Sequence, residues 1–214
     1  MGRGKRMIVM FDTSHDLKVC ESEIGETAEQ LFTPLTRYKN RHEDQHFAID
    51  NGAFSRFDRS AFEALLQRER ERRHLCRFVA VPDVVGSARR TLEAFDYWFS
   101  RLGGWPLALV CQDGQEDHAI PWDLIDAIFI GGSTEWKMSA SAISCIKAAQ
   151  LMNKHVHVGR VNTPDRFEWC VQLGVDSVDG SGISRYSEMR TKIRDRNSSR
   201  QSQLFAAACN GNYA

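Results

Sequence analysis

The sequence lacks the features that would assign it to several common protein classes. None of its apolar runs is long enough to cross a membrane or to form the core of a signal peptide. Lys plus Arg and Asp plus Glu both number 28, so the net charge of zero gives no argument for or against a nucleic-acid partner. None of the six cysteines falls in a CxxC or CxC pair, which argues against a zinc knuckle. We therefore expect a cytoplasmic protein with reduced thiols and no membrane partner.

One zinc pattern is present. Residues 42–46 read His-Glu-Asp-Gln-His and match HExxH, which binds zinc only on a helix, where residues four apart share one face. The apolar stretch Phe47–Ile49 follows at once and is typical of a strand, and no third ligand is placed. We interpret 42–46 as a loop and predict no metal site.

Short apolar runs recur along the chain and alternate with stretches of helical spacing. The predicted strands are 7–11, 46–49, 77–81, 106–110, 127–130, 155–158 and 175–178. The predicted helices are 61–73, 88–102, 139–152 and 164–173. Thr163 and Pro164 are the expected cap and first-turn residues of the last of these helices. This alternation predicts parallel βα units.

Polar or glycine residues follow six of the seven strands. They are Asp50–Gly52, Pro82–Asp83, Gln112–Gly114, Gly131–Gly132, Gly159–Arg160 and Asp179–Gly180. An open doubly wound sheet, the alternative architecture, needs such chemistry only near its switch point, whereas all the rim loops of a barrel converge on one site. We therefore favour an α/β fold, a small TIM-like (β/α) barrel forming a single domain over residues 1–214. No eighth strand is evident, so whether the barrel is complete stays open; we expect a loop-rich insertion at 12–45 and a last short helix at 201–209.

Asp50 and Asp179 each end a predicted strand. Paired carboxylates on converging strand ends carry glycosidic chemistry, in which one attacks an oxocarbenium-like carbon and the other moves protons. Asp83 and Gln112 would suit the hydrogen-bonding edge of a guanine-like base, and Phe54 would supply a stacking face. Each residue alone also has a structural interpretation, as a turn aspartate or a core ring. Gly131-Gly132 fits a phosphate cradle or a tight turn beside a flat ligand.

From about Phe47 to Arg185 the chain resembles the tRNA-guanine transglycosylase superfamily, most closely its DNA-acting branch from phages and bacteria. The motifs that carry the resemblance are Asp50-Asn51-Gly52-Ala53-Phe54, Asp83, Cys111-Gln112-Asp113-Gly114, Phe129-Ile130-Gly131-Gly132, Val158-Gly159 with Asn162-Thr163-Pro164, and Gly174-Val175-Asp176-Ser177-Val178-Asp179. The chain departs from the family in lacking its CxCxxC zinc site. It also has Ser133-Thr134-Glu135-Trp136 after the double glycine, in place of the family's usual continuation.

The resemblance implies a role for each motif. Asp179 is the implied nucleophile and Asp50 the implied proton-transfer residue. The implied base contacts are Asp83, Gln112, Gly131, Gly132, Phe54, Val158 and Gly159. The implied enzyme is a DNA-guanine transglycosylase that replaces guanine with a 7-deazaguanine, 7-cyano-7-deazaguanine being favoured. No cofactor is implied, and a phage-encoded enzyme would work in the cytoplasm of its bacterial host.

The stretch 185–200 is expected to contact the DNA backbone at the barrel rim. It holds Arg185, Arg190, Lys192, Arg194, Arg196 and Arg200 against Glu188 and Asp195, so six basic minus two acidic residues give a local charge of +4. Its serines and asparagine indicate a flexible segment that orders on phosphates. Three alternatives stay open: a tRNA-acting enzyme, a nucleoside or base hydrolase of the same fold, and a catalytically inactive nucleic-acid-binding barrel. The oligomeric state is also open.

Overall fold

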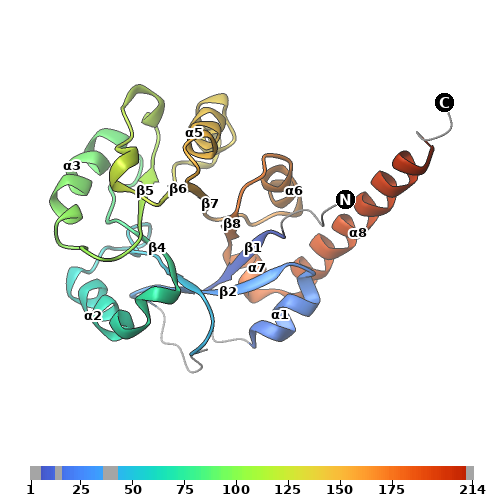
Figure 1. Ribbon diagram of the computed structural model, residues 1–214, viewed down its shortest axis with the longest axis horizontal. Helices are drawn as coiled ribbons and strands as arrows, with labels where there is room; N and C mark the ends of the chain where they lie inside the picture. The colour runs from blue at the N-terminus through green and yellow to red at the C-terminus, as the bar shows by residue number, and fades with distance from the viewer. Residues whose placement is uncertain (1–5, 13–15, 36–42, 211–214) are drawn as a thin grey trace.

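A computed structural model describes residues 6–12, 16–35 and 43–210, with side chains described as far as residue 199. Eight parallel strands pair in chain order and close into a barrel, because β8 pairs with β1 (Figure 1). The strands are β1 (Ile8–Phe11), β2 (Thr27–Phe32), β3 (Phe47–Ile49), β4 (Cys76–Ala80), β5 (Leu107–Cys111), β6 (Ala127–Ile130), β7 (His155–Val158) and β8 (Ser177–Asp179). The expected TIM-like barrel is confirmed, as are all seven strands predicted from the apolar runs.

Helices surround the barrel. They are α1 (Leu17–Ile24), α2 (Arg59–Glu69), α3 (Ala88–Phe99), α4 (Thr134–Lys137), α5 (Ala140–Leu151), α6 (Pro164–Gln172), α7 (Ser181–Arg185) and α8 (Ser187–Asn210), with short 3₁₀ helices η1 (Arg70–Leu75), η2 (Gln115–Asp117) and η3 (Trp122–Leu124). Thr163 caps α6 by accepting a hydrogen bond from the backbone of Arg166, and Pro164 occupies its first turn, as predicted. No helix in the described part of the chain has both the length and the apolar character needed to cross a bilayer.

The barrel is complete, which answers the open question of an eighth strand, and the expectation of a loop-rich insertion at 12–45 is wrong. The described part of that stretch contains α1 and the missing strand, β2. The β2 sequence TAEQLF does not look like a buried strand, because the polar residues Glu29 and Gln30 interrupt its apolar run. Both side chains are nevertheless buried. Glu29 is neutralised by Arg77 from β4, with Nη2 and Oε1 2.7 Å apart. An acid buried against a distant arginine cannot be recognised from local hydropathy.

The chain ends in a long helix. The expected short helix at 201–209 is the last part of α8, which begins at Ser187 and takes in nearly all of the basic stretch 185–200. The helix packs against α1 and α6, and its C-terminal part extends beyond the barrel (Figure 1). The basic stretch is therefore an element of the fold, and the expected flexible segment is wrong.

Alternation along the strands directs the site residues inward. The barrel interior is filled by a cluster that includes Ala48 of β3 and Val110 of β5, while the alternate residues pack outward against the helices. Asp50 lies two residues after Ala48, and Gln112 lies two after Val110. The same period of two carries both polar side chains into the mouth of the barrel, at the C-terminal ends of the strands.

Candidate active site

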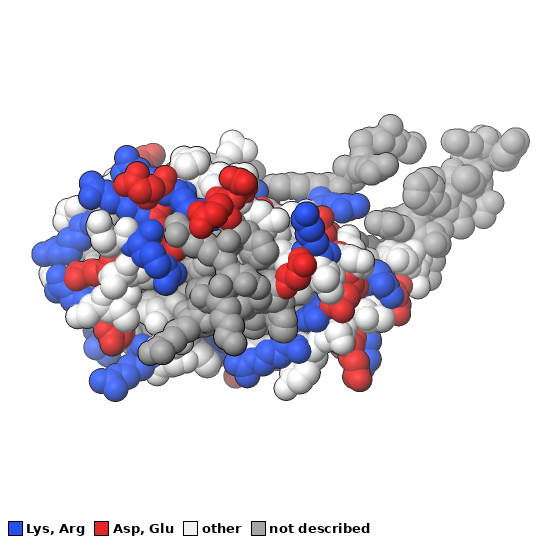
Figure 2. Space-filling view, turned by 90° about the horizontal axis from the view of Figure 1, so that it is seen from below, with Lys and Arg blue, Asp and Glu red and all other residues white. Residues whose placement is uncertain are grey.

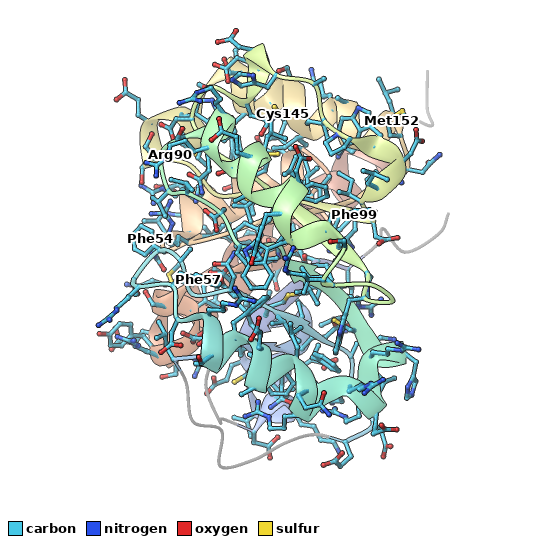
Figure 3. The ribbon with its side chains drawn as sticks, turned by 90° about the vertical axis from the view of Figure 1, so that its left-hand side faces the viewer. Phe54, Phe57, Arg90, Phe99, Cys145 and Met152 are labelled. Atoms are coloured by element: carbon cyan, nitrogen blue, oxygen red, sulfur yellow. The ribbon has the colours of Figure 1, made fainter. Side chains whose placement is uncertain are left out.

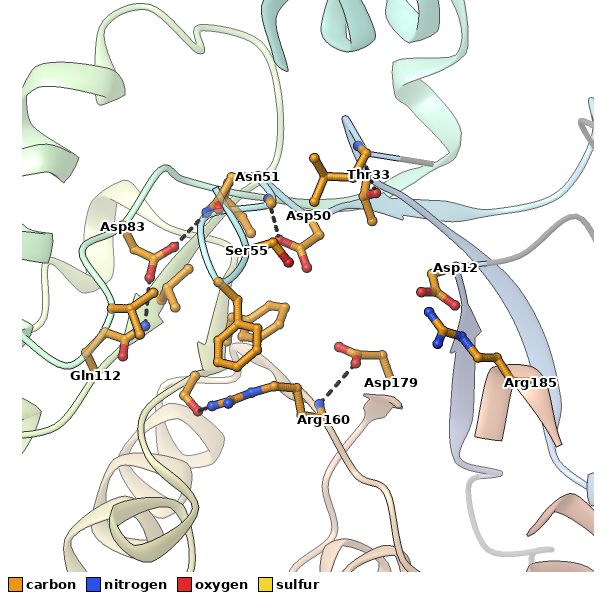
Figure 4. Close-up of a pocket in the computed structure, with 18 residues that line it drawn as sticks. Asp12, Thr33, Asp50, Asn51, Ser55, Asp83, Gln112, Arg160, Asp179 and Arg185 are labelled. Atoms are coloured by element: carbon orange, nitrogen blue, oxygen red, sulfur yellow. Dashed lines mark hydrogen bonds between the residues drawn. The ribbon is translucent and has the colours of Figure 1, made fainter. Parts of the chain in front are cut away.

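A cavity of about 350 Å³ lies at the C-terminal ends of the strands (Figure 4). Four carboxylates and two guanidinium groups line it: Asp12, Asp50, Asp83, Asp179, Arg160 and Arg185. The cavity has the size of a small-ligand site and the position at which TIM barrels bind substrates. The converging rim expected from the sequence is therefore present.

Asp179 ends β8 and is held in place from two sides. Its Oδ2 lies 3.0 Å from Nε2 of His157, and its Oδ1 accepts a 3.0 Å hydrogen bond from the backbone N–H of Arg160. Burial alone would raise the pKa of Asp179, but the hydrogen bond and charge interaction with His157, the Arg160 hydrogen bond and the charge of Lys137 outweigh it and lower the pKa below its ordinary value. Asp179 is therefore an ionised carboxylate at neutral pH.

Asp50 lies directly after β3, where its backbone N–H donates to the carbonyl of Phe32 over 2.9 Å. Its Oδ1 accepts from the backbone N–H of Gly52, which has a left-handed φ of 78°. Burial raises the pKa of Asp50 to about 7. The Gly52 hydrogen bond opposes this rise, and the nearby Asp179 and Asp83 carboxylates add to it. Asp50 is therefore poised to carry or release a proton near neutral pH.

Asp83 lies between two amide side chains (Figure 4). Its Oδ1 accepts from Nδ2 of Asn51 over 2.8 Å, and its Oδ2 accepts from Nε2 of Gln112 over 2.7 Å. Burial raises the pKa of Asp83, against the effect of both hydrogen bonds. Oε1 of Gln112 accepts from the backbone N–H of Gly86 over 2.9 Å. The two residues assigned to the base edge thus form one rigid polar wall of the cavity.

Phe54 is 64% exposed and lines the cavity. Its neighbour Phe57 instead packs with Phe62 and Trp98, at ring-centroid distances of 5.9 and 5.7 Å, between α2 and α3 (Figure 3). The guanidinium of Arg160 lies over the Phe54 ring, 4.2 Å from its centroid. Phe54 is therefore a ring of the site and not of the core.

Arg160 is a site residue that the sequence analysis missed. Its backbone has a left-handed φ of 60°, which is uncommon for a residue with a side chain. Its Nη2 donates to the carbonyl of Gly131 over 3.0 Å and also to that of Gly132. One residue thus holds Asp179 through its N–H and crosses the cavity with its side chain. A positive φ cannot be read from a sequence, so the only sequence signal was its place after a strand.

The glycines of the expected base site have different positions. Gly131 lines the cavity, and a Cβ there would lie 2.8 Å from both Gln112 and Val110. A Cβ on Gly132 would lie 2.3 Å from the ring of Trp136, and one on Gly159 would lie 2.5 Å from Phe129. These two glycines permit close packing behind the cavity and do not line it.

Val158 is also outside the cavity. It is buried in the outer core between strands and helices, so its side chain points away from the site. The structure therefore brings together Asp50, Asp179, Asp83, Gln112, Phe54, Gly131 and Arg185, and it leaves Val158, Gly132 and Gly159 behind the wall.

The basic stretch does not form one surface at the rim. Arg185 lines the cavity, whereas Arg190 is buried. Nε of Arg190 is 2.5 Å from a carboxylate oxygen of Glu23, and its Nη1 donates to the carbonyl of Ile183 over 2.7 Å. Arg190 is therefore a structural residue, and its expected contact with DNA is wrong.

Farther along α8 the helix reaches the other end of the barrel. Asn197 donates to Oε1 of Glu26, whose Oε2 accepts from the backbone N–H of Met7. Glu26 and Met7 directly precede β2 and β1, so this part of α8 lies at the N-terminal ends of the strands. Arg194 and Arg196 pair with Asp195 and Asp165. Neither arginine lines the cavity, so neither joins Arg185 in the expected contact at the rim; Lys192 is exposed.

Figure 2 shows Lys and Arg interspersed with Asp and Glu over the described part of one face. The described residues contain no group of three or more His, Cys, Asp or Glu side chains that could hold a metal ion. His42 of the HExxH pattern lies outside the described residues, and residues 43–45 form a turn before β3.

No family model and no curated protein matches the chain. Among solved structures, one described as "Native KDPGal structure" shares 10% identity at a TM-score of 0.45, covering 94% of this chain and 98% of that one. A second is a cube-shaped, highly porous protein cage designed by fusing symmetric oligomeric domains. It shares 12% identity at a TM-score of 0.40, covering 98% of this chain and 80% of that one. Likenesses this low carry no argument about function, and the barrel is established by its strand pairing.

Proposed function

We propose that the protein is a DNA-guanine transglycosylase that replaces guanine with a 7-deazaguanine through a glycosyl ester on Asp179. One observation carries the proposal: Asp50 and Asp179 line the same cavity, and their surroundings push the two pKa values apart. A pair of carboxylates separated in this way divides into a proton carrier and a permanent anion. The motif resemblance supplies the substrate class.

In the first step, a carboxylate oxygen of Asp179 bonds to C1′ of a deoxyguanosine and the C1′–N9 bond breaks. The electron pair of that bond passes to the departing guanine, which takes the proton of Asp50 and leaves as the neutral base. A pKa of about 7 keeps a large fraction of Asp50 protonated at neutral pH. The ionised state of Asp179 makes it the nucleophile of the pair.

In the second step, the incoming 7-deazaguanine gives its N9 proton to the Asp50 carboxylate, and N9 attacks C1′. The ester bond breaks and its electron pair returns to Asp179. Two displacements at one carbon retain the configuration of the sugar, as in retaining glycosidases. Water must stay out while the ester exists, because hydrolysis would leave an abasic site.

The wall formed by Asp83 and Gln112 suits the guanine edge. A carboxylate accepts from the donors at N1 and N2 of the base, and an amide N–H donates to its carbonyl. Gln112 Nε2 has one N–H directed to Asp83 and a second left for a ligand. The exposed Phe54 ring adds a stacking surface, one face of which is shared with Arg160.

DNA is proposed as the polymer on the resemblance, and Arg185 and Arg160 are the cations of the cavity that a flanking phosphate would meet. The target base must leave the duplex stack, at a cost of a few kcal/mol, to reach a cavity at the mouth of a barrel.

The proposal is tested by incubating the protein with labelled 7-cyano-7-deazaguanine and one of four acceptors: duplex DNA, single-stranded DNA, tRNA or deoxyguanosine. We expect label in DNA, and none with Asp179→Asn. Guanine release without incorporation would identify a hydrolase, and label in tRNA alone would identify the tRNA-acting enzyme. Label in no acceptor and no release of guanine would overturn the proposal.

A further inference from the structure

A hydrogen-bonded chain of side chains runs through the barrel interior and ends on Asp179. Nε2 of His157 lies 3.0 Å from Oδ2 of Asp179, and Nδ1 of the same ring lies 2.8 Å from Oγ of Ser177. That Oγ also lies 2.7 Å from Nε2 of His155, the first residue of β7. His157 and Ser177 are register partners on the adjacent strands β7 and β8. This series of hydrogen bonds therefore extends from the N-terminal end of the barrel to the cavity.

His157 is fully buried among rings. Its side chain is 0% exposed, and its ring centroid lies 5.1 Å from that of Phe78 on β4 and 4.5 Å from that of Phe129 on β6. The titratable groups that face this ring are Asp179 and, through Ser177, His155. An imidazole in such surroundings costs free energy unless both nitrogens are bonded, and here both are.

The direction of these hydrogen bonds follows from the state of Asp179. An ionised carboxylate only accepts, so the hydrogen between His157 and Asp179 is on Nε2, whether the ring is neutral or charged. With a neutral ring, Nδ1 accepts from the Ser177 hydroxyl, whose oxygen accepts from His155. With a charged ring, the two bonds at Ser177 reverse. In both states Ser177 and His155 leave Nε2–H directed at Asp179.

We propose that His157 is the positioning residue of Asp179, fixing the orientation of its carboxylate and keeping it ionised, with Ser177 and His155 holding the ring in place. The inference rests on the proposed function only in giving Asp179 the role of nucleophile. The charged groups around Asp179 are Lys137 of α4 and the other charged residues that line the cavity, which are Arg160, Arg185, Asp12, Asp50 and Asp83. Among the described residues, His157 is the side chain that donates a hydrogen bond to this carboxylate.

Two similar substitutions of His157 test the roles of its two ring nitrogens one at a time. The amide of Asn occupies the place of Nδ1, so His157→Asn retains a partner for Ser177 and loses the donor to Asp179. The amide of Gln reaches the place of Nε2, so His157→Gln retains that donor. Both variants put an uncharged amide at the same buried site, so their effects on folding are matched. His118→Gln, at an exposed histidine, is the control.

Two readouts decide the proposal. In exchange assays, His157→Asn should lower kcat by about 10- to 100-fold, which is the effect expected from losing a hydrogen bond to a charged group. The KM for the base should change little. It should also move the acidic limb of the pH profile to higher pH. His157→Gln should restore most of kcat, and His118→Gln should match the wild type. The second readout is the titration of the Asp179 carboxyl carbon by NMR, which needs no turnover; its pKa should rise in His157→Asn and not in His157→Gln.

The NMR result separates this inference from the proposed function. A protein without exchange activity in which His157→Asn still raises the pKa of Asp179 would sink the proposed function and support the positioning role. An Asp179 carboxyl that titrates alike in the wild type and in His157→Asn would overturn the positioning role, whatever the exchange assay shows.

Discussion

The ends of β3 and β8 present the same side chain to the same cavity in opposite electrostatic settings. Asp50 at β3 accepts one backbone hydrogen bond and is otherwise desolvated, with three other carboxylates nearby. Asp179 at β8 receives a histidine, a backbone N–H and the field of a buried lysine. The pKa of the first rises to about 7 and that of the second falls. Neighbours within hydrogen-bond distance, and not residue type, decide which aspartate carries the proton.

Removing the anion of this pair should have the largest effect. Asp179→Asn keeps the shape of the side chain and loses the nucleophile, so base exchange should fall below detection while the fold is retained. Exchange rates and the circular dichroism spectrum of the variant check this. Measurable exchange in a folded Asp179→Asn protein would place the nucleophile elsewhere.

Removing the proton carrier should have the next largest effect. Asp50→Asn should slow exchange by about 10²–10⁴-fold, the usual value of a positioned proton-transfer group. Guanine departure in the wild type needs protonated Asp50, so the rate of that step should fall as the pH rises through about 7. The variant should lose this alkaline limb, as measured by single-turnover guanine release between pH 5 and 9. A limb that persists in Asp50→Asn would assign it to another group.

Asp83, a third carboxylate of the cavity, tests whether the proton-carrier and anion roles are specific to Asp50 and Asp179. Asp83 has both carboxylate oxygens hydrogen-bonded to neutral amides, so it should select the base without moving a proton. Asp83→Asn should weaken guanine binding by about 10- to 100-fold, because one buried hydrogen-bond partner is lost or inverted. Competition between guanine and hypoxanthine, which lacks the 2-amino group, should become nearly even in this variant. Unchanged selectivity would make Asp83 a structural residue only.

The same contrast should appear in protein stability, with opposite signs. The folded state raises the pKa of Asp50, so the contribution of this group to stability is full at acidic pH and is lost as the pH rises toward about 7. The free energy of unfolding of Asp50→Asn minus that of the wild type should therefore be more positive at pH 8 than at pH 5, by about 1–3 kcal/mol.

Asp179 has a lowered pKa, so its contribution is present at neutral pH and is lost in acid. Asp179→Asn should destabilise the protein at pH 7, by about 1–3 kcal/mol. Denaturant unfolding of both variants at several pH values measures the difference. Changes of the same sign in the two variants would contradict the assignment of their protonation states.

The smallest effect concerns the arginines inside and outside the cavity. Arg185 lines the cavity, whereas Arg194 and Arg196 are paired with carboxylates outside it. Arg185→Ala should flatten the slope of log affinity for duplex DNA against log salt by about 0.9, the loss of one phosphate contact. The double variant of Arg194 and Arg196 to Ala should leave that slope unchanged. The reverse pattern would mean that α8, and not the rim, binds DNA.

The sequence predicted the barrel well, because seven strands are recognisable as apolar runs and six of these runs are followed by polar or glycine residues. It could not predict β2, whose buried Glu29 is neutralised by Arg77, 48 positions away in the chain. The helical state of 187–200 was missed because a polar, basic stretch carries little apolar periodicity. Arg190 of this helix is buried against Glu23, a partner 167 positions away in the chain that no local pattern indicates.

The same distinction holds at the candidate site. Asp50, Asp83, Gln112 and Asp179 follow strands, and position after a strand can be read locally. The role of His157 cannot be read locally, because it depends on the contact with Asp179, which the pairing of β7 with β8 brings about. Val158 was placed in the base site by motif alone, and strand alternation turns it outward.

The central claim, that Asp179 is the nucleophile and Asp50 the proton carrier, is tested most directly by isolating the glycosyl ester. The protein is mixed with guanine-containing DNA without an incoming base, quenched in denaturant and digested, and the peptides are analysed by mass spectrometry. We predict a DNA adduct that survives denaturation, maps to Asp179, is absent in Asp179→Asn and forms more slowly in Asp50→Asn. An adduct on another residue, or one that persists in Asp179→Asn, would contradict the account.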